Sequence, residues 1–114
     1  MSDNLVKANI IGLKDDSKKP LVVQGFMQYF PNAIAEVARV SEFGAQKYAW
    51  GNWQFVHAGI ERYTEALGRH LLATDEIDPE SNLLHAAHTA WNAMARLELI
   101  LKEKNNDSVS AVDS

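Results

Sequence analysis

Two short interruptions constrain the fold of this chain more than any other feature of its sequence. AWGNWQF (residues 49–55) and TDEIDPES (residues 74–81) separate stretches in which apolar residues recur three and four positions apart. That spacing places the apolar residues on one face of an α-helix. Because the connections are short, successive helices are expected to pack as antiparallel neighbours. The sequence therefore predicts an all-α fold, a small bundle of about three or four main helices.

The limits of the predicted helices follow from where the apolar pattern starts and stops. Pro31 suits the first turn of a helix that continues through NAIAEVARVSEFGAQKYA. The second helix covers roughly residues 56–73, and the last runs from about Pro79 to Lys102. Before these helices, LVVQGFMQYF (residues 21–30) is a short apolar run that is either a strand or the start of a helix.

The two ends of the chain differ from its middle. At 114 residues the chain is expected to form one domain, whose ordered part covers residues 13–103. The polar termini have no apolar period, so residues 1–12 are predicted to be flexible and residues 104–114 to form a disordered tail. A small domain buries a limited share of its surface, and with the aromatic stretches this favours a homo-oligomer.

The composition argues against several classes of protein. The chain has no cysteine, which fits a reducing cytoplasm and leaves imidazole or oxygen atoms as the ligands of any metal. A net charge of −4 argues against binding to DNA or RNA polymers, although local basic groups could still meet a small phosphate ligand. The sequence has no apolar run of about 18 residues and no signal-peptide pattern, so neither a membrane nor a secreted protein is expected.

A polar stripe on the last predicted helix is the first candidate for a functional site. His85, His88, Asn92 and Arg96 share one side of this helix, opposite its apolar face. An ordinary solvated face uses glutamate and lysine, as LKEKNN (residues 101–106) does. Imidazoles three positions apart can converge on one cation, since their Cβ atoms are about 5–6 Å apart. The alternative is a polar interface with a neighbouring subunit.

Other acidic and histidine side chains have two possible roles. His70 lies on the apolar face of the second helix, so it is either a core histidine or faces His85 and His88 from the neighbouring helix. Glu36 and Glu65 are either carboxylate ligands or ordinary surface charges of their helices.

The acidic turn offers a helix cap that could also serve the site. Asp78 before Pro79 is typical of a helix N-cap, which contributes about 1 kcal/mol, and Ser81 is a candidate for the same cap. A helix N-terminus also favours anions, so capping and ligand binding are compatible.

Basic and aromatic residues are candidates for contacts with phosphates and a base. Trp50 and Trp53, on either side of Gly51 and Asn52, either stack on a base or close the top of the bundle. Four lysines either bind phosphate groups or are simply solvated: Lys14, Lys18, Lys19 and Lys47.

Several segments in order resemble a known family. SEFGAQKYAWGNW (41–53), RYTEALGRHLLA (62–73) and DPESNLLHAAHTAWNA (78–93) resemble the small, mostly phage-encoded family of dATP/dGTP diphosphohydrolase N-terminal domains, and LKDDSKKP (13–20) matches an upstream element. The resemblance covers roughly residues 13–100. It implies an all-α protein similar to MazG-type nucleotide pyrophosphohydrolases, which cleave nucleoside triphosphates between the α and β phosphates. If the chain is phage-encoded, the cytoplasm of the bacterial host is the expected location.

The resemblance also assigns roles to individual residues. It implies a metal-dependent reaction of dGTP or dATP that gives monophosphate and pyrophosphate, with Mg²⁺, Mn²⁺ or Co²⁺ as the divalent ion. The expected catalytic residues are His70, His85, His88 and Asp78, and the same four with Glu36 are the expected metal ligands. The expected substrate-binding residues are Lys14, Lys18, Lys47, Tyr48, Asn52, Trp53, Arg69, Ser81 and Asn92. The match also includes Asp16 and Gly44, to which the resemblance assigns no role.

One departure from the MazG pattern bears on the metal. MazG-type enzymes hold Mg²⁺ with paired carboxylates, whereas His85-x-x-His88 stands here where Glu-x-x-Asp is expected. Mg²⁺ prefers oxygen ligands, and a histidine-rich site suits Mn²⁺, Fe, Co²⁺ or Zn²⁺ better. Two other functions therefore stay open: a non-catalytic protein that sequesters a nucleotide, and a structural helical oligomer whose histidine stripe lies between subunits.

Overall fold

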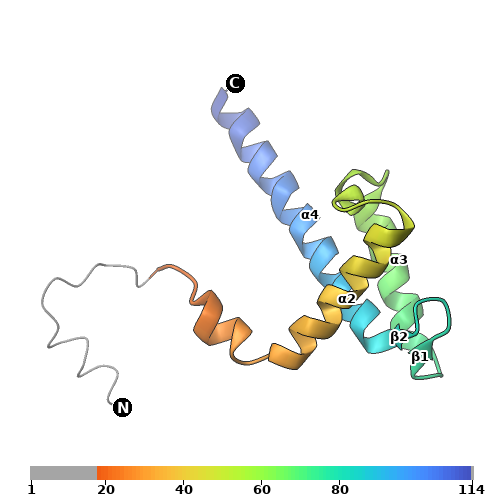
Figure 1. Ribbon diagram of the computed structural model, residues 1–114. Coiled ribbons are helices and arrows are strands. Elements are labelled where there is room, and N and C mark those ends of the chain that lie inside the picture. Colours follow the sequence, from red (N-terminus) through yellow and green to blue (C-terminus); the bar gives the residue numbers. More distant parts are fainter. Residues whose placement is uncertain (1–17, 114) are drawn as a thin grey trace, which may run out of the picture.

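The computed structural model describes the backbone of residues 18–113 and the side chains of residues 18–107, and it confirms the all-α prediction. Three long helices dominate, and a two-stranded hairpin joins the last two (Figure 1). The predicted flexible segment 1–12, Lys14 and Asp16 lie outside the described residues. The elements are η1 (Val23–Met27), α2 (Pro31–Lys47), η2 (Asn52–Phe55), α3 (Gly59–Leu72), β1 (Ile77–Asp78), β2 (Leu83–Leu84) and α4 (His85–Asp113).

The apolar run before α2 is helical rather than extended. It forms a single π-helical turn in which the Gln28 amide donates to the Val23 carbonyl at 2.9 Å. The segment extends away from the helical body (Figure 1). None of its residues is buried, so its apolar side chains are exposed. Helix α2 then begins at Pro31, as the sequence predicts.

Helices α3 and α4 form the closest packed pair, and they run in roughly opposite directions (Figure 1). Gly59 is buried at the start of α3, where an added Cβ would lie 2.8 Å from Leu99 Cδ1 of α4. The absence of a side chain at this position therefore permits the close approach of the two helices.

An aromatic cluster ties the loop between α2 and α3 to the helices. The Trp53, Tyr63 and Trp91 rings pack at centroid distances of 5.5 to 6.4 Å. Tyr63 Oη donates to the Trp53 carbonyl at 2.6 Å, and Trp91 Nε1 donates to Ser41 Oγ of α2 at 2.8 Å. Trp53 thus packs against Tyr63 of α3 and Trp91 of α4, which fits the predicted role of closing one end of the bundle. It also lines a cavity described below.

The predicted start of the last helix is wrong. The segment from Ile77 to Leu84 is a β-hairpin, in which Ile77 pairs with Leu84 and Asp78 with Leu83, and α4 begins only at His85. The Asp78 carboxylate accepts hydrogen bonds inside the turn instead of capping a helix. Asn82 adopts a left-handed conformation with φ 61°, which asparagine tolerates better than most residues, and its amide donates to the Asp78 carbonyl at 2.8 Å.

Helix α4 also extends further than predicted, and it turns part of its polar stripe inward. It continues to Asp113, through the segment that the sequence predicts to be a tail. His88 and Asn92, predicted to be on the outer side, are only 6% and 5% exposed. Met94 and Leu97, apolar residues expected to face inward, are about half exposed. The reason is that α3 and α2 pack over His88 and Asn92, whereas Arg96 at the end of the stripe stays exposed.

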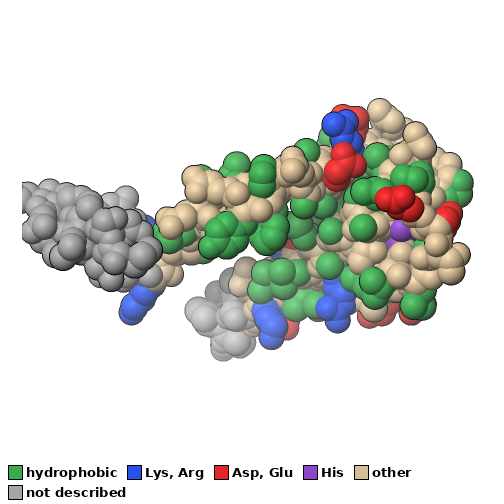
Figure 2. All heavy atoms as spheres, turned by 90° about the horizontal axis from the view of Figure 1, so that it is seen from below, with side chains coloured by type: hydrophobic (Ala, Val, Ile, Leu, Met, Phe, Trp, Pro, Cys, Tyr) green, Lys and Arg blue, Asp and Glu red, His purple; other side chains and the backbone are tan. Residues whose placement is uncertain are grey.

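The packed core is small. Among residues 18–107, the buried hydrophobic residues are Val40, Ala87 and Ala95, and no large side chain is fully buried. Apolar side chains instead line the surface of the η1–α2 segment (Figure 2). No helix in the described part of the chain is long and apolar enough to cross a membrane.

Candidate functional site

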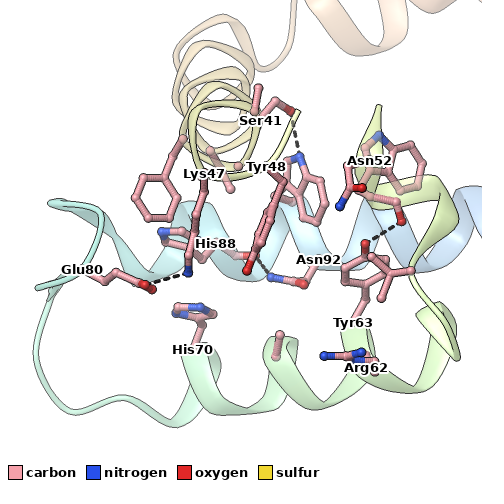
Figure 3. Close-up of a pocket in the computed structure, with 18 of the residues that line it drawn as sticks. Ser41, Lys47, Tyr48, Asn52, Arg62, Tyr63, His70, Glu80, His88 and Asn92 are labelled. Atoms are coloured by element: carbon pink, nitrogen blue, oxygen red, sulfur yellow. Dashed lines mark hydrogen bonds and ion pairs between the residues drawn. The ribbon is translucent and has the colours of Figure 1, made fainter. Parts of the chain in front are cut away.

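A cavity of about 640 Å³ opens beside the aromatic cluster, between the end of α2, the following loop, α3, the hairpin and α4 (Figure 3). The structure brings nine of the predicted site residues to its wall. They are Lys47, Tyr48, Asn52, Trp53, Arg69, His70, Asp78, His88 and Asn92. Segments far apart in the sequence therefore form one polar, aromatic-lined hollow.

Four ionisable wall residues were not among the predicted site residues: His57, Arg62, Tyr63 and Glu80. Arg62 had a detectable signal, because it precedes Arg69 by seven residues and so lies two turns away on the same face of α3. Glu80 had no such signal, since only the hairpin turns it toward α2.

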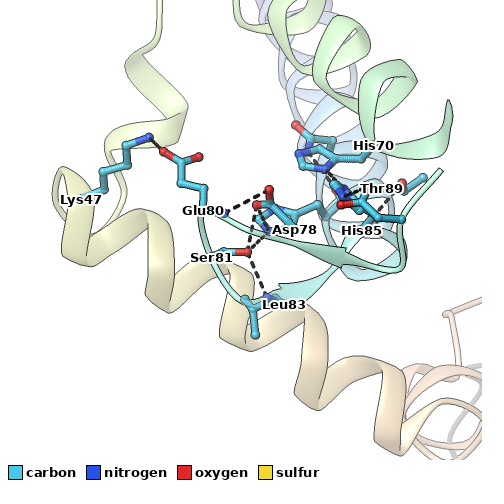
Figure 4. Close-up of polar contacts among 11 residues, drawn as sticks. Lys47, His70, Asp78, Glu80, Ser81, Leu83, His85 and Thr89 are labelled. Carbon is cyan, nitrogen blue, oxygen red and sulfur yellow. Dashed lines mark hydrogen bonds and ion pairs between the residues drawn. The ribbon is translucent and has the colours of Figure 1, made fainter. Parts of the chain in front are cut away.

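Some predicted residues do not reach the cavity wall. His85 and Ser81 lie behind it and contact wall residues (Figure 4). Glu36 lies elsewhere on α2 and forms an exposed ion pair with Arg39 at 3.1 Å. Lys18 is exposed and is not part of the cavity.

Three histidines form a connected group at the hairpin end of the cavity. The His70 and His88 rings are stacked, with centroids 4.4 Å apart and planes inclined by 10°. On its other side, His70 Nδ1 lies 2.9 Å from His85 Nδ1 (Figure 4). Of the two positions left open for His70, the structure therefore has the one that faces His85 and His88 of the neighbouring helix.

The hairpin supports His88 through Ser81 and Asp78. Ser81 Oγ lies 2.7 Å from His88 Nε2, 3.0 Å from Asp78 Oδ2 and 3.2 Å from the Leu83 amide nitrogen. Because the carboxylate only accepts, the single Ser81 hydrogen points to Asp78, and Ser81 Oγ accepts from Leu83 and His88. His88 therefore carries a proton on Nε2, and its Nδ1 is unprotonated when the ring is neutral.

Burial sets the charge of these groups. Desolvation lowers the pKa of His70 and of His88 below the ordinary histidine value, so both rings are neutral near pH 7. Burial by itself raises the pKa of Asp78, but hydrogen bonds from Ser81 and the Glu80 amide outweigh it, and the net pKa lies below the ordinary value. At the hairpin end, the wall thus combines the neutral imidazoles of His70 and His88 with the ionised carboxylate of Asp78.

Cationic side chains line the same cavity as the histidines. Lys47 Nζ forms an ion pair with Glu80 at 2.7 Å and lies 5.6 Å from the centre of the Tyr48 ring (Figure 3). The hydrogen bond that Lys47 donates to the Glu80 carboxylate is the main cause that raises the pKa of Lys47, which stays protonated. With Arg62 and Arg69, the wall presents three cations near its aromatic rings.

The five residues predicted to bind a metal do not converge. Glu36 does not line the cavity. The Nδ1 atoms of His70 and His85 face each other at 2.9 Å, and His88 Nε2 contacts Ser81 of the hairpin. Two nearly parallel rings also direct their lone pairs in parallel planes, which disfavours joint binding of one ion. Among the described residues, no group of three or more histidines and carboxylates could hold a metal. This set of side chains does not fit a metal held by the protein alone.

The fold and cavity define a small helical domain whose polar hollow is walled by cations, histidines and aromatic rings. Its sequence belongs to the family of dATP/dGTP diphosphohydrolase N-terminal domains, whose model matches residues 11–109. A relative named dATP/dGTP diphosphohydrolase, from Salmonella phage PMBT28, is 37% identical over 100 residues, which cover 84% of this chain and 32% of the relative. The chain therefore spans about a third of that relative's length. No solved structure matches it significantly.

Proposed function

We propose that this domain binds dATP or dGTP in the cavity and hydrolyses it to the deoxynucleoside monophosphate and pyrophosphate. Family membership and the name of the phage relative support this activity. The observation that carries the proposal is the wall itself, where Lys47, Arg62 and Arg69 accompany aromatic rings and two neutral histidines. A nucleoside triphosphate has a chemical group for each of these: an aromatic base for the rings, a polyphosphate for the cations, and a phosphorus atom that water can attack once a histidine takes its proton.

The polyphosphate would lie against the cations. Arg62 and Arg69 stand on the same face of α3, and guanidinium groups bind phosphate oxygens through two parallel hydrogen bonds. Lys47 approaches from the end of α2 as a third positive charge. These groups would neutralise the charge that accumulates on the leaving pyrophosphate.

The base would lie near the loop that follows α2. Tyr48 and Trp50 are 68% and 73% exposed and border the cavity, so their rings are accessible for stacking. Asn52 offers an amide donor and acceptor that could pair with the edge of a purine.

The hydrolysis step needs a group that takes a proton from water. The water oxygen would form a bond to the α phosphorus while the bond to the α–β bridging oxygen breaks and its electron pair leaves with pyrophosphate. A neutral imidazole of His70 or His88 can accept the water proton near pH 7. In this proposal Asp78 and Ser81 orient His88.

The role of a divalent ion stays a prediction. Nucleotide enzymes commonly receive Mg²⁺ bound to the phosphates of the substrate, with few protein ligands. Dependence on Mg²⁺, Mn²⁺ or Co²⁺ is therefore part of the proposal as a property of the substrate complex.

A second candidate function is binding of the nucleotide without hydrolysis. The failure of the predicted metal ligands to converge favours this function. Metal ions are a common source of phosphoryl activation, and carboxylates are their usual ligands. A sequestering protein would need the same cations and aromatic rings.

Phosphorus NMR of incubated nucleotides separates the two functions. The protein would be mixed with each deoxynucleoside and ribonucleoside triphosphate in the presence of Mg²⁺, Mn²⁺, Co²⁺ or a chelator. We expect pyrophosphate from dATP and dGTP with wild type and with Arg39→Ala, a cation outside the cavity, and much less with Arg69→Ala. Intact nucleotides that raise the melting temperature of the protein would support the binding function instead. Intact nucleotides with no thermal shift would contradict both.

A further inference from the structure

Three side chains form a line that ends at the cavity. Asp75, in the loop after α3, places Oδ1 3.2 Å from His85 Nε2. On the other side of the same ring, His85 Nδ1 lies 2.9 Å from His70 Nδ1 (Figure 4). Of these three residues, His70 alone contributes to the cavity wall. The line from Asp75 through His85 therefore reaches the cavity at His70.

The contact between the two histidines constrains their protons. At 2.9 Å, two ring nitrogens form a hydrogen bond only if one carries a proton and the other does not. Two arrangements of the neutral pair satisfy this condition. Either His85 donates and leaves its own Nε2 bare, or His70 donates and leaves its Nε2 bare.

The surroundings of His85 Nε2 decide between the two arrangements. This nitrogen is buried and has no hydrogen-bond partner among the described residues. The carboxylate of Asp75 is within ion-pair distance, although its present angle is not that of a hydrogen bond, and its side chain is 64% exposed and can rotate. A carboxylate only accepts, so a bare nitrogen beside it would be repelled, whereas an N–H would be stabilised.

We propose that Asp75 is a positioning residue that holds the proton of His85 on Nε2 and thereby fixes His70 as the tautomer with its bare Nε2 toward the cavity. His85 Nδ1 then accepts from His70 Nδ1–H. The bare His70 nitrogen is the base of the proposed reaction, on which this inference rests. It takes the proton of the water that attacks the α phosphorus. The imidazolium that forms at His70 still donates its Nδ1–H to His85, and the carboxylates of Asp78 and Glu80 favour its charge.

Nitrogen-15 NMR of the histidine rings tests the tautomer without reference to activity. At pH 7.5 in the free protein, we expect the proton of His70 on Nδ1 and that of His85 on Nε2. Asp75→Asn should reverse both assignments, because the asparagine amide can donate to His85 Nε2. Glu76→Gln removes a charge from the same loop and should change neither ring. A wild-type His70 with its proton on Nε2, or an unchanged pattern in Asp75→Asn, would overturn the inference.

Kinetics supply the second measurement. Asp75→Asn should lower kcat about two- to fivefold with little change in KM, since the carboxylate is largely exposed. Asp75→Glu keeps the carboxylate and should retain most of the wild-type kcat, and Glu76→Gln should have the kcat of wild type. An equal loss of kcat in Glu76→Gln would overturn the positioning role. If wild type hydrolyses no nucleotide, the proposed function fails, while the ring spectra still decide whether Asp75 sets the tautomer.

Discussion

At the scale of single residues, buried histidines make the stability of this domain depend on pH. The pKa values of His70 and His88 are lowered in the folded state, so the unfolded chain binds protons first as the pH falls. Their contribution is fully present above the unfolded pKa of about 6.5 and is lost as the pH falls through the folded values. We therefore expect the free energy of unfolding, from urea titrations, to decrease between pH 7.5 and pH 5. A constant value over this range would contradict the assignment of both rings as desolvated and neutral.

The Lys47–Glu80 ion pair leads to a prediction about substrate affinity. Lys47→Ala should raise KM for the nucleotide about tenfold, as expected for one lost hydrogen bond to a charged group. Glu80→Gln should lower KM, because the lysine would no longer be neutralised by a neighbour 2.7 Å away. Steady-state kinetics at constant ionic strength would measure both. Opposite signs for the two variants are the specific expectation, and a rise in KM for both would contradict it.

The sequence predicted most of the polar side chains of the cavity wall but not their arrangement. Polar residues at helical spacing on the last helix correctly indicated that His88 and Asn92 are not ordinary surface residues. Glu36 was chosen by residue type alone, and the structure places it beside Arg39 instead. Asp75 could not be recognised, because its relation to His85 depends on the path of the loop rather than on any period.

At the scale of elements, the hairpin before α4 organises the histidine group. Asp-Pro followed by an apolar period is typical of a helix start, so sequence reasoning extended the helix too far toward the N-terminus. The carboxylate and hydroxyl of this segment form hydrogen bonds within the turn, and this local competition cannot be judged from periodicity.

The left-handed conformation of Asn82 makes the hairpin testable. Asn82→Val should destabilise the domain by about 1–2 kcal/mol, because a β-branched side chain is strained at φ 61°. Asn82→Gly should stay close to wild type, since glycine adopts this conformation without strain. Urea denaturation monitored by circular dichroism would compare them. Equal stability of the valine and glycine variants would show that this backbone conformation is not required.

At the scale of the whole molecule, the small core and the exposed apolar surface favour association between copies. The exposed residues Ala90, Met94, Leu97 and Leu101 are spaced four, three and four apart along α4, the spacing of a coiled-coil seam. A second copy would supply an identical helix that matches this seam.

Light scattering after size exclusion would test this association. We expect wild type to elute as a homo-oligomer and Leu97→Glu as a smaller species. Leu72→Glu, a change at an exposed leucine on α3, is the matched control and should leave the mass unchanged. A monomeric wild type would contradict the expectation and leave the seam to another partner.

The most direct test of the proposed function is hydrolysis of dGTP and dATP in water enriched in ¹⁸O, with the products separated by anion exchange and weighed by mass spectrometry. Attack at the α phosphorus predicts a deoxynucleoside monophosphate that carries one ¹⁸O atom and an unlabelled pyrophosphate. Intact triphosphates, or diphosphate with inorganic phosphate, would contradict a diphosphohydrolase acting through this cavity.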